Sequence, residues 1–261
     1  MKYATILLAL AILPQAHAGD DTQKILACMQ ANLPPAAQVE NVELSSSDNA
    51  GSTRTLSGRI YAQRKATHSG RELMVTLRIK GPAPYAGAAY TIREPGEGKP
   101  GSMLVYLPSV QRVRRITGAF VDGSLMGTNF SYQDFRQLAT AFAGSTATLE
   151  APAAIDQRPV YVLSFKPPAD SHSSFNTIRA WVDQKTCVPL QASFYAGKSL
   201  LKTLTASPDA LRQSGKYWYL SEMEMHDLRN GTQTTLRISH VSEGVSFDRH
   251  VFEPNSFYQG E

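Results

Sequence analysis

The most constraining feature of the 261-residue sequence is a run between positions 72 and 80 in which every second residue is apolar and the intervening residues, apart from Met74, are polar. The apolar members of this alternation are Leu73, Val75, Leu77 and Ile79. A period of two residues is that of a β-strand, because successive side chains of a strand point to opposite faces of its sheet. The segment therefore predicts a strand with one face against a core.

Similar strand-like runs, separated by turn residues, continue along most of the chain. The predicted strands are 56–64, 72–80, 88–94, 102–107, 110–116, 159–167, 176–183, 189–195, 200–206, 216–228 and 232–244. Turn residues at 95–101, 196–198 and 230–231 are typical of hairpin connections. About eleven strands joined by short turns indicate an antiparallel sheet of the meander type.

Helices are few in this interpretation. Asp20 or Asp21 is expected to cap a helix that carries Ile25, Cys28, Met29 and Leu33 on one side and ends at Pro34 and Pro35. A second helix is predicted over 132–142, with Asn129 or Ser131 as its cap. Its apolar stripe consists of Phe135, Leu138 and Phe142, and we expect it to plug the concave face of the sheet.

The segments between these elements indicate one unit. Residues 45–53 are rich in Ser, Asn and Gly and predict a loop, and residues 152–159 predict a hinge at most. No fixed-period repeat or low-complexity linker divides the chain. We expect a single domain over residues 19–261.

The first 18 residues have the features of a signal peptide. Lys2 precedes an apolar stretch from Ala4 to Leu13, and Ala16, His17 and Ala18 form an A-x-A cleavage site. The stretch is too short to span a bilayer. The sequence predicts export to the periplasm of a Gram-negative cell, with cleavage after Ala18.

The two cysteines, Cys28 and Cys187, have a simple interpretation in an oxidising compartment. One disulfide would join the N-terminal helix to the sheet, and two buried free thiols are the alternative. No C-x-x-C motif is present, and no Cys/His spacing suits zinc. We expect no metal.

Catalytic motifs are absent from the sequence. The histidines beyond the signal peptide, at 68, 172, 226, 240 and 250, form no His-x-x-x-His pair, and Gly-x-Ser-x-Gly does not occur. Ser199 and Lys202 match Ser-x-x-Lys by chance, at the start of a predicted strand. We expect no enzyme and no cofactor, although groups that meet only in space remain open. A net charge of +4 without a dense basic run argues against a nucleic-acid partner.

Large and flexible apolar side chains are the positive evidence for function. The candidate cavity residues are Leu73, Val75, Leu77, Met103, Val105, Tyr106, Trp181, Phe194, Tyr219, Met223 and Met225. Met adapts its shape, and aromatic rings offer wide contact area, which suits a pocket for acyl chains. The alternative is that these residues form the core. The strand 216–228 has apolar groups on both faces, which favours either two packed layers or a cavity wall.

Three arginines, Arg112, Arg114 and Arg115, lie on one predicted strand. They are candidates for contact with lipid headgroups or with an acidic docking surface. The alternative is that they form a solvated outer face or protect a sheet edge with their charge.

A family resemblance emerges from residues 106–135. Tyr106, Leu107 and Pro108 precede the arginine-rich strand, and the segment 123–135 reads GSLMGTNFSYQDF. This pattern resembles the LolA-like outer-membrane lipoprotein-sorting protein family, with Leu125 where the family often has Phe and Asn129 where it often has Asp. Segments 181–183, 187–190 and 251–252 fit the same pattern.

The resemblance implies an incomplete β-barrel whose open, concave side is covered by two or three helices that enclose an apolar cavity. It also implies a monomeric, non-catalytic periplasmic carrier of lipid or lipoprotein acyl chains that works with an inner-membrane transporter. The rival hypotheses are a periplasmic sensor or adaptor that uses the same fold to bind a protein, and a hydrolase whose groups meet only in space.

Overall fold

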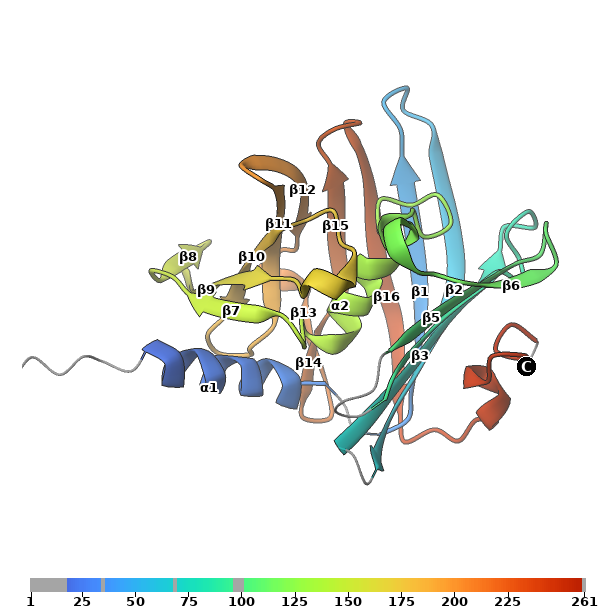
Figure 1. Ribbon diagram of the computed structural model, residues 1–261, viewed down its shortest axis with the longest axis horizontal. Helices are drawn as coiled ribbons and strands as arrows, with labels where there is room; N and C mark the ends of the chain where they lie inside the picture. Colours follow the sequence, from blue (N-terminus) through green and yellow to red (C-terminus); the bar gives the residue numbers. More distant parts are fainter. Residues whose placement is uncertain (1–17, 34–35, 68–69, 96–100, 260–261) are drawn as a thin grey trace, which may run out of the picture.

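A computed structural model of the protein describes residues 18–33, 36–67, 70–95 and 101–259 (Figure 1). The predicted signal peptide, apart from Ala18, lies outside these residues. So do the two prolines expected to end the first helix, His68 and most of the predicted turn at 95–101.

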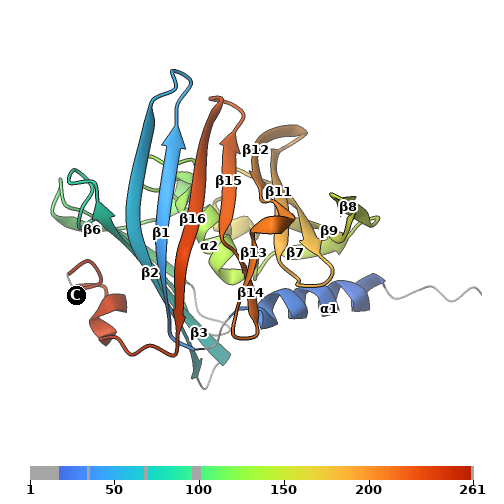
Figure 2. The same ribbon diagram turned by 180° about the vertical axis from the view of Figure 1, so that it is seen from behind.

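One curved antiparallel sheet dominates the described residues, and it does not close into a barrel (Figures 1 and 2). Its strands follow the order β6-β5-β4-β3-β2-β1-β16-β15-β12-β11-β10-β9-β7, with β8 paired to β9, while β13 and β14 form a separate hairpin. The strands are β1 (Gln38–Ser47), β2 (Thr53–Thr67), β3 (Gly70–Gly81), β4 (Ala89–Glu94), β5 (Ser102–Leu107), β6 (Arg112–Arg115), β7 (Thr146–Leu149), β8 (Ala153–Ile155), β9 (Arg158–Lys166), β10 (Thr177–Asp183), β11 (Pro189–Ala196), β12 (Ser199–Thr205), β13 (Leu211–Ser214), β14 (Tyr217–Leu220), β15 (Glu222–Asp227) and β16 (Thr232–Glu243). The predicted fold class, mainly β with a half-open sheet, is confirmed.

The middle of this sheet joins the two ends of the chain. β1 pairs with β2 on one side and with β16 on the other, from Gln38 opposite Glu243 to Ser47 opposite Gln233. We call β1 to β6 the N-terminal wing, and β16, β15 and β12 to β7 the C-terminal wing. Among the described strands, the pairing of β1 with β16 is the only hydrogen-bonded junction between the wings.

Helix α2 (Tyr132–Thr140) lies across the concave face of the sheet (Figures 1 and 2). Ser131 is its N-cap: the Ser131 hydroxyl accepts from the Asp134 amide, and the Asp134 carboxylate accepts from the Ser131 amide. This reciprocal capping box satisfies two backbone donors that a helix start otherwise leaves unpaired. Of the two predicted caps, Ser131 is therefore the one that acts.

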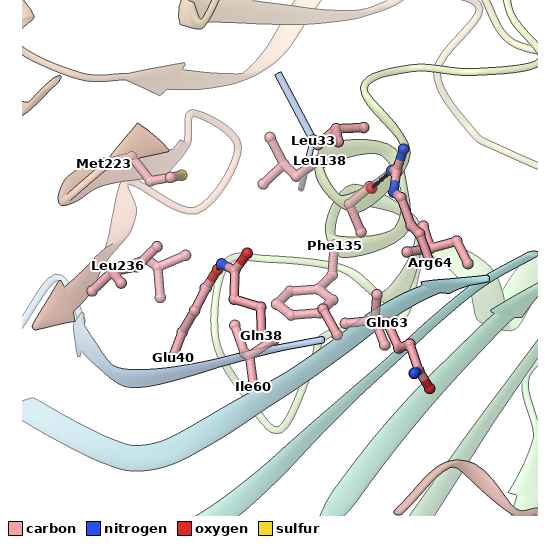
Figure 3. Close-up of a pocket in the computed structure, with 15 residues that line it drawn as sticks. Leu33, Gln38, Glu40, Ile60, Gln63, Arg64, Phe135, Leu138, Met223 and Leu236 are labelled. Atoms are coloured by element: carbon pink, nitrogen blue, oxygen red, sulfur yellow. Dashed lines mark hydrogen bonds between the residues drawn. The ribbon is translucent and has the colours of Figure 1, made fainter. Parts of the chain in front are cut away.

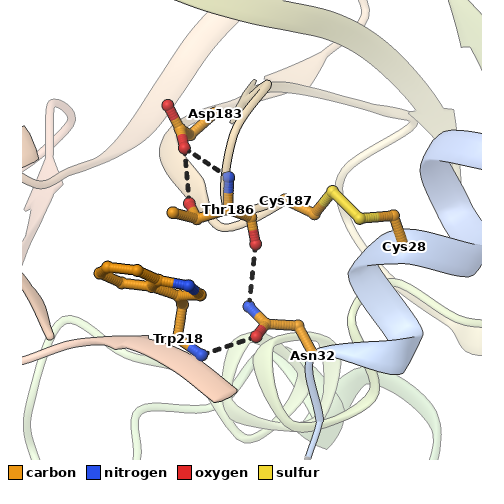
Figure 4. The surroundings of a disulfide bond; sticks show 6 residues. All are labelled: Cys28, Asn32, Asp183, Thr186, Cys187 and Trp218. Atoms are coloured by element: carbon orange, nitrogen blue, oxygen red, sulfur yellow. Dashed lines mark hydrogen bonds between the residues drawn. A yellow bond between two sulfur atoms is a disulfide. The ribbon is translucent and has the colours of Figure 1, made fainter. Parts of the chain in front are cut away.

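Helix α1 (Ala18–Ala31) runs along one end of the C-terminal wing. Ile25 and Met29 are buried in the main core, as their spacing predicted. The helix includes Asp20 and Asp21, so the prediction that one of them caps it was wrong. Cys28 bonds to Cys187 in the turn between β10 and β11, over a sequence separation of 159 residues (Figure 4).

The convex face of the N-terminal wing is covered by the C-terminal segment of the chain. The Arg78 Nε donates to the Phe257 carbonyl at 2.6 Å, and the Thr76 hydroxyl donates to the Val251 carbonyl at 2.9 Å. Phe252 and Phe257 are buried there. The C-terminal segment thus shields the part of the convex face formed by residues such as Tyr61, Met74 and Leu104 from water.

Four strands escaped prediction, and one predicted strand is divided. Residues 45–53 are not a loop throughout, because β1 extends to Ser47 and β2 begins at Thr53. Hydroxyl groups pair between β1 and both of its neighbours: Ser45 Oγ lies 3.0 Å from Thr55 Oγ1 of β2, and Ser46 Oγ lies 2.9 Å from Thr234 Oγ1 of β16. Such cross-strand pairs stabilise a sheet that apolar periodicity does not reveal. β7, β8 and β13 were also missed, and the predicted strand 216–228 breaks at Ser221 into β14 and β15.

Candidate functional site

An apolar pocket opens on the concave side, between α2 and the centre of the sheet (Figure 3). Its volume is about 190 Å³. The lining residues come from the segment just after α1, from β1, β2, β3, β15 and β16, and from α2. They are Leu33, Gln38, Glu40, Ile60, Ala62, Gln63, Arg64, Leu73, Val75, Phe135, Leu138, Ala139, Met223, Leu236 and Ile238. The pocket therefore lies over the junction of the two wings.

The segment between β6 and α2 explains how the helix is held above this pocket. Leu125 and Phe130 are buried, and the Asn129 side chain bonds to Thr232 and Thr234 of β16 at 2.7 and 2.8 Å. The Arg54 guanidinium donates to the Gly127 carbonyl at 2.7 Å. Gly127 has φ of +77°, and a Cβ there would lie 2.6 Å from Arg54 Nη2. A side chain at this position would be strained by the positive φ and would displace the Arg54 guanidinium, so glycine is favoured here.

Helix α2 is attached to both wings. On the N-terminal wing, Arg136 makes a bidentate ion pair with Glu94, with Nη2 2.9 Å from Oε2, and the Tyr90 hydroxyl donates to the Tyr132 carbonyl at 3.0 Å. On the C-terminal wing, Lys202 of β12 forms a buried ion pair with Asp134. Lys202 was dismissed as half of a chance Ser-x-x-Lys match, and its role here is to anchor the start of α2.

Phe135 forms part of the pocket wall and part of the core at once. It is buried and packs edge-on against Tyr90, with ring centroids 5.9 Å apart. Leu138 lies one turn further along α2 and also lines the pocket. Figure 3 shows the Phe135 ring between the Gln38 and Glu40 side chains on one side and Arg64 on the other.

Two polar groups on β1 border this largely apolar space. Glu40 is half-buried, and its carboxylate accepts a hydrogen bond from the Gln38 side chain. Protein atoms surround the carboxyl group, and this desolvation raises its pKa to about 7, while the bond from Gln38 acts in the opposite direction. The pocket thus contains an acid that titrates near neutrality.

Arg64 lies at the other side of the pocket. Its Nη2 donates to the Ala139 carbonyl near the end of α2 at 3.2 Å. Desolvation lowers the pKa of its guanidinium to about 10, and the like charge of Arg71 acts in the same direction. The group remains positively charged at neutral pH.

The structure brings only some of the sequence candidates to this pocket. Leu73, Val75 and Met223 line it, together with Phe135 and Leu138 of the predicted plug. A second group is buried in the main core away from the pocket lining: Leu77, Met103, Val105, Phe194, Met225 and Phe142. Phe142 stacks on Phe165 of β9, with ring centroids 4.7 Å apart.

Three further candidates lie outside both the pocket and the main core. Tyr106 stacks on Tyr258 at 3.8 Å, under the C-terminal segment on the convex face. Trp181 packs with Val160 and Leu190 in a separate cluster and lies under the guanidinium of Arg179. Tyr219 belongs to the β13–β14 hairpin, because the strand break at Ser221 separates it from Met223. Strand alternation explains the first two, since neighbours of a core residue point to the opposite face.

Sequence reasoning missed most of the pocket on β1 and β16. The missed residues are Gln38, Glu40, Ile60, Ala62, Gln63, Arg64, Ala139, Leu236 and Ile238, together with Leu33, which was assigned only to the side of α1. β1 carries four polar residues among its first six, so no apolar alternation marked it as a strand. Leu236 and Ile238 do alternate on β16, and that signal was available.

The arginines at 112, 114 and 115 occupy β6, the edge strand of the N-terminal wing, and all three are exposed. The neighbouring Phe120 is also exposed, at 74%. This position fits the protection of a sheet edge and equally fits contact with a partner.

The other side chains that could act in catalysis or metal binding do not cluster among the residues that the structure describes. No group of three or more His, Cys, Asp or Glu side chains that could hold a metal ion occurs in the described parts of the chain. No helix there is long and apolar enough to cross a membrane. His226 bonds to Glu224 on the same strand and lies outside the pocket lining.

Residues 72–259 match the model of a protein family that is described as an uncharacterized protein. The chain belongs to this family. No curated protein matches the sequence significantly.

Comparison with solved structures identifies the fold of the chain. A DUF1329 family protein from Desulfovibrio piger aligns with a TM-score of 0.82 at 22% identity, over 90% of this chain and 97% of that one. A protein described as an outer membrane lipoprotein-sorting domain, from Vibrio parahaemolyticus, aligns at 0.78 with 22% identity and the same coverages. A LolA superfamily protein from Nitrosomonas europaea aligns at 0.67 with 18% identity, over 88% and 96% of the two chains. The LolA-like fold that the sequence resemblance implied is therefore confirmed.

Proposed function

We propose that the protein is an exported, non-catalytic carrier that binds the acyl chains of a lipid or an acylated lipoprotein in the pocket under α2. The observation that carries this proposal is an apolar pocket at the junction of the wings, roofed by one short helix. The similarity in fold to lipoprotein-sorting proteins supports it.

The physical task of such a carrier is to keep hydrocarbon away from water. Each exposed methylene costs about 0.8 kcal/mol to hydrate, so a free acyl chain does not cross an aqueous compartment on its own. Side chains such as Leu73, Val75, Leu138 and Leu236 offer an apolar surface in place of water. They remove this cost without chemistry at the site.

The pocket of about 190 Å³ is smaller than the roughly 300–1,000 Å³ of pockets that enclose drug-sized ligands. A complete acyl chain therefore needs α2 to move away from the sheet. The bond between Arg64 and the Ala139 carbonyl is one contact that such movement breaks.

The remaining parts of the proposal concern place and partners. A signal peptide at residues 1–18 would deliver a mature domain of residues 19–261 to the periplasm, where a monomer would exchange cargo with an inner-membrane transporter. Arg112, Arg114 and Arg115 on the β6 edge would contact that partner or lipid headgroups.

The direct test is to identify the cargo. Protein purified from the periplasm is extracted with organic solvent, and the extract is quantified by mass spectrometry. We expect about one equivalent of bound lipid or acylated peptide per chain. Repeated recovery of empty protein that takes up no lipid would reject the proposal.

A pocket-filling variant sharpens this test. Ala139→Phe adds bulk to a half-buried residue that lines the pocket, and we expect it to reduce lipid uptake while the fold is retained. Ala153→Phe on β8 is the matched control, since Ala153 is exposed and distant from the lining residues. Equal uptake by both variants would place the cargo elsewhere.

A second candidate function, a sensor or adaptor that binds a protein, is favoured by the exposure of Phe120 beside the β6 edge. In a strain that lacks the native gene, Phe120→Ser would abolish the activity of an adaptor, whereas Ala139→Phe would abolish that of a carrier. The variant that fails to restore the phenotype of the strain shows whether the protein acts as an adaptor or as a carrier.

A further inference from the structure

The pocket has an excess of positive charge at one side of its rim. Arg64 on β2 lines the pocket, and Arg71 lies on β3. In the register of these strands, Arg64 is opposite Leu73 and Ala66 is opposite Arg71. Arg64 and Arg71 therefore share the face that carries Leu73 and Val75, which is the face of the pocket. We call these two residues the basic rim.

No carboxylate neutralises the basic rim among the described residues. The Arg64 guanidinium bonds only to the neutral Ala139 carbonyl. Two acids share this face: Glu94 is engaged in its bidentate pair with Arg136, and Glu40 is bonded to Gln38 at the other side of the pocket. Glu72 is on the opposite face of β3 and is bonded to Arg93.

In the environment of Arg64, a positive charge without an anionic partner is energetically unfavourable. The guanidinium is half-buried, and its lowered pKa reflects desolvation together with the like charge of Arg71. A partly desolvated cation gains more from an anionic partner than an exposed cation does, because water screens the attraction less. A planar guanidinium is also suited to the paired oxygens of a carboxylate or phosphate.

We propose that the pocket selects an amphiphile with an anionic headgroup, whose carboxylate or phosphate contacts Arg64 and Arg71 while its acyl chain lies along the apolar wall. This inference rests on the proposed carrier function and specifies the class of its cargo. The chain would run from the rim past Phe135 toward Leu236 and Ile238.

The other polar side of the pocket agrees with this orientation. Glu40 and Gln38 lie across the Phe135 ring from Arg64 (Figure 3). In its ionised form, which predominates above about pH 7, the Glu40 carboxylate repels an anionic headgroup and directs it to the basic rim. The two sides of the pocket therefore impose one polarity on a bound amphiphile.

Two lipids that differ only in a phosphate test this inference. Myristoyl lysophosphatidic acid and monomyristoylglycerol carry the same acyl chain and glycerol, but only the first is anionic. Their affinities for the delipidated full-length mature protein are measured by displacement of the uncharged fluorophore N-phenyl-1-naphthylamine, below the micellar concentration of each lipid. We expect the phosphate-bearing lipid to bind about tenfold more tightly, and added salt to reduce this preference.

Substitutions in the basic rim test whether it is the source of the preference for the phosphate-bearing lipid. Arg64→Gln and Arg71→Gln are each expected to reduce it about threefold or more, with little change in the affinity for monomyristoylglycerol. Arg71→Gln carries particular weight, because Arg64 also contacts α2. Lys65→Gln is the matched control: it removes the same charge from the next residue of β2, whose side chain lies on the opposite face and is exposed. It should preserve the preference.

The outcomes separate this inference from the carrier proposal. Equal binding of both lipids by the unmodified protein, or a preference that survives Arg71→Gln, would overturn the anionic selection and leave the carrier intact. Failure of both lipids to bind would overturn both. Displacement of the phosphate-bearing lipid by inorganic phosphate alone would identify a phosphate site and overturn the assignment to a lipid headgroup.

Discussion

The two wings of the sheet share one helix but differ in what lies beneath it. The concave side of the C-terminal wing is filled by aromatic side chains, with Phe142 stacked on Phe165 and Phe175 packed at 5.3 Å against Phe194. The junction with the N-terminal wing is hollow, and α2 bridges it through hydrogen bonds and ion pairs at its ends.

This difference indicates that the two wings have different roles, one as a rigid frame and the other as part of the pocket. Close packing fixes the C-terminal wing as a frame, and the disulfide to α1 adds to that rigidity. The polar contacts of α2 with the N-terminal wing can break one by one at modest cost. A ligand entering between α2 and the sheet would have to break these bonds and separate the Phe135 ring from Tyr90 of the N-terminal wing.

The largest expected effect comes from a substitution at Phe135, which belongs both to the core and to the pocket wall. Phe135→Asp removes a buried ring and places a charge in its site, and we expect the free energy of unfolding to fall by about 5 kcal/mol. Lipid uptake should be lost as well. Urea denaturation and a lipid-binding assay measure the two effects, with Phe135→Leu as the milder control. Unchanged melting and unchanged uptake would show that α2 is not the plug.

The next effect concerns the anchor on the C-terminal wing. Lys202→Met leaves the Asp134 carboxylate buried without its partner, and we expect a loss of roughly 3–5 kcal/mol. The double variant Lys202→Met with Asp134→Asn removes that charge and should recover part of the loss. A double-mutant cycle in urea measures the coupling. Additive losses would mean that the pair does not hold α2 to its frame.

Removal of the disulfide tests the frame without touching the pocket. Cys28→Ala with Cys187→Ala is expected to lower stability by roughly 2–5 kcal/mol, because the unfolded chain loses the constraint of a very long loop. Thermal melting measures the loss, and a reducing agent should lower the melting temperature of the unmodified protein alone. Lipid affinity should remain. A large loss of affinity in the folded variant would contradict the separation of frame and pocket.

The smallest effect is expected from Glu40 at the hollow junction. Its pKa is raised from 4.5 to about 7 on folding, so its contribution to stability is fully present below about pH 4.5 and is lost as the pH rises through 7. The full shift corresponds to about 3.5 kcal/mol, at ~1.4 kcal/mol per pKa unit, and contact with water at this half-buried position reduces the loss below that figure. Melting temperatures between about pH 5 and pH 8 should fall for the unmodified protein and fall less for Glu40→Gln. Identical pH profiles would show that Glu40 does not titrate in this range.

The sequence predicted those strands in which apolar residues alternate with polar ones. The alternation from Leu73 to Ile79 predicted the buried face of β3, and the spacing of Phe135 and Leu138 predicted the side of α2 that faces the sheet. Phe142, the third member of the predicted stripe, lies beyond the end of the helix at Thr140 and has a positive φ. Strand β1 has no such alternation, because serine hydroxyls on Ser45 and Ser46 pair with neighbouring strands in place of apolar packing. Its pairing with β16 depends on residues almost two hundred positions away, and local periodicity carries no information about such a contact.

The candidate site was harder to predict for a related reason. Periodicity tells which residues share a face, but it does not tell whether another side chain fills the space above that face. Met225 and Phe194 belong to the filled region and Met223 to the pocket, although all three read alike in sequence. The arginine at position 64 was not singled out, because its position beside an apolar cavity depends on where α2 comes to rest.

The pairing of β1 with β16 also has a consequence for the order in which the molecule can form. Strand β1 emerges early in synthesis, and its neighbour across the junction is completed only at Glu243. Contacts between such distant segments form slowly. The junction between the wings is therefore completed only by β16, whatever pairs form earlier within the N-terminal wing.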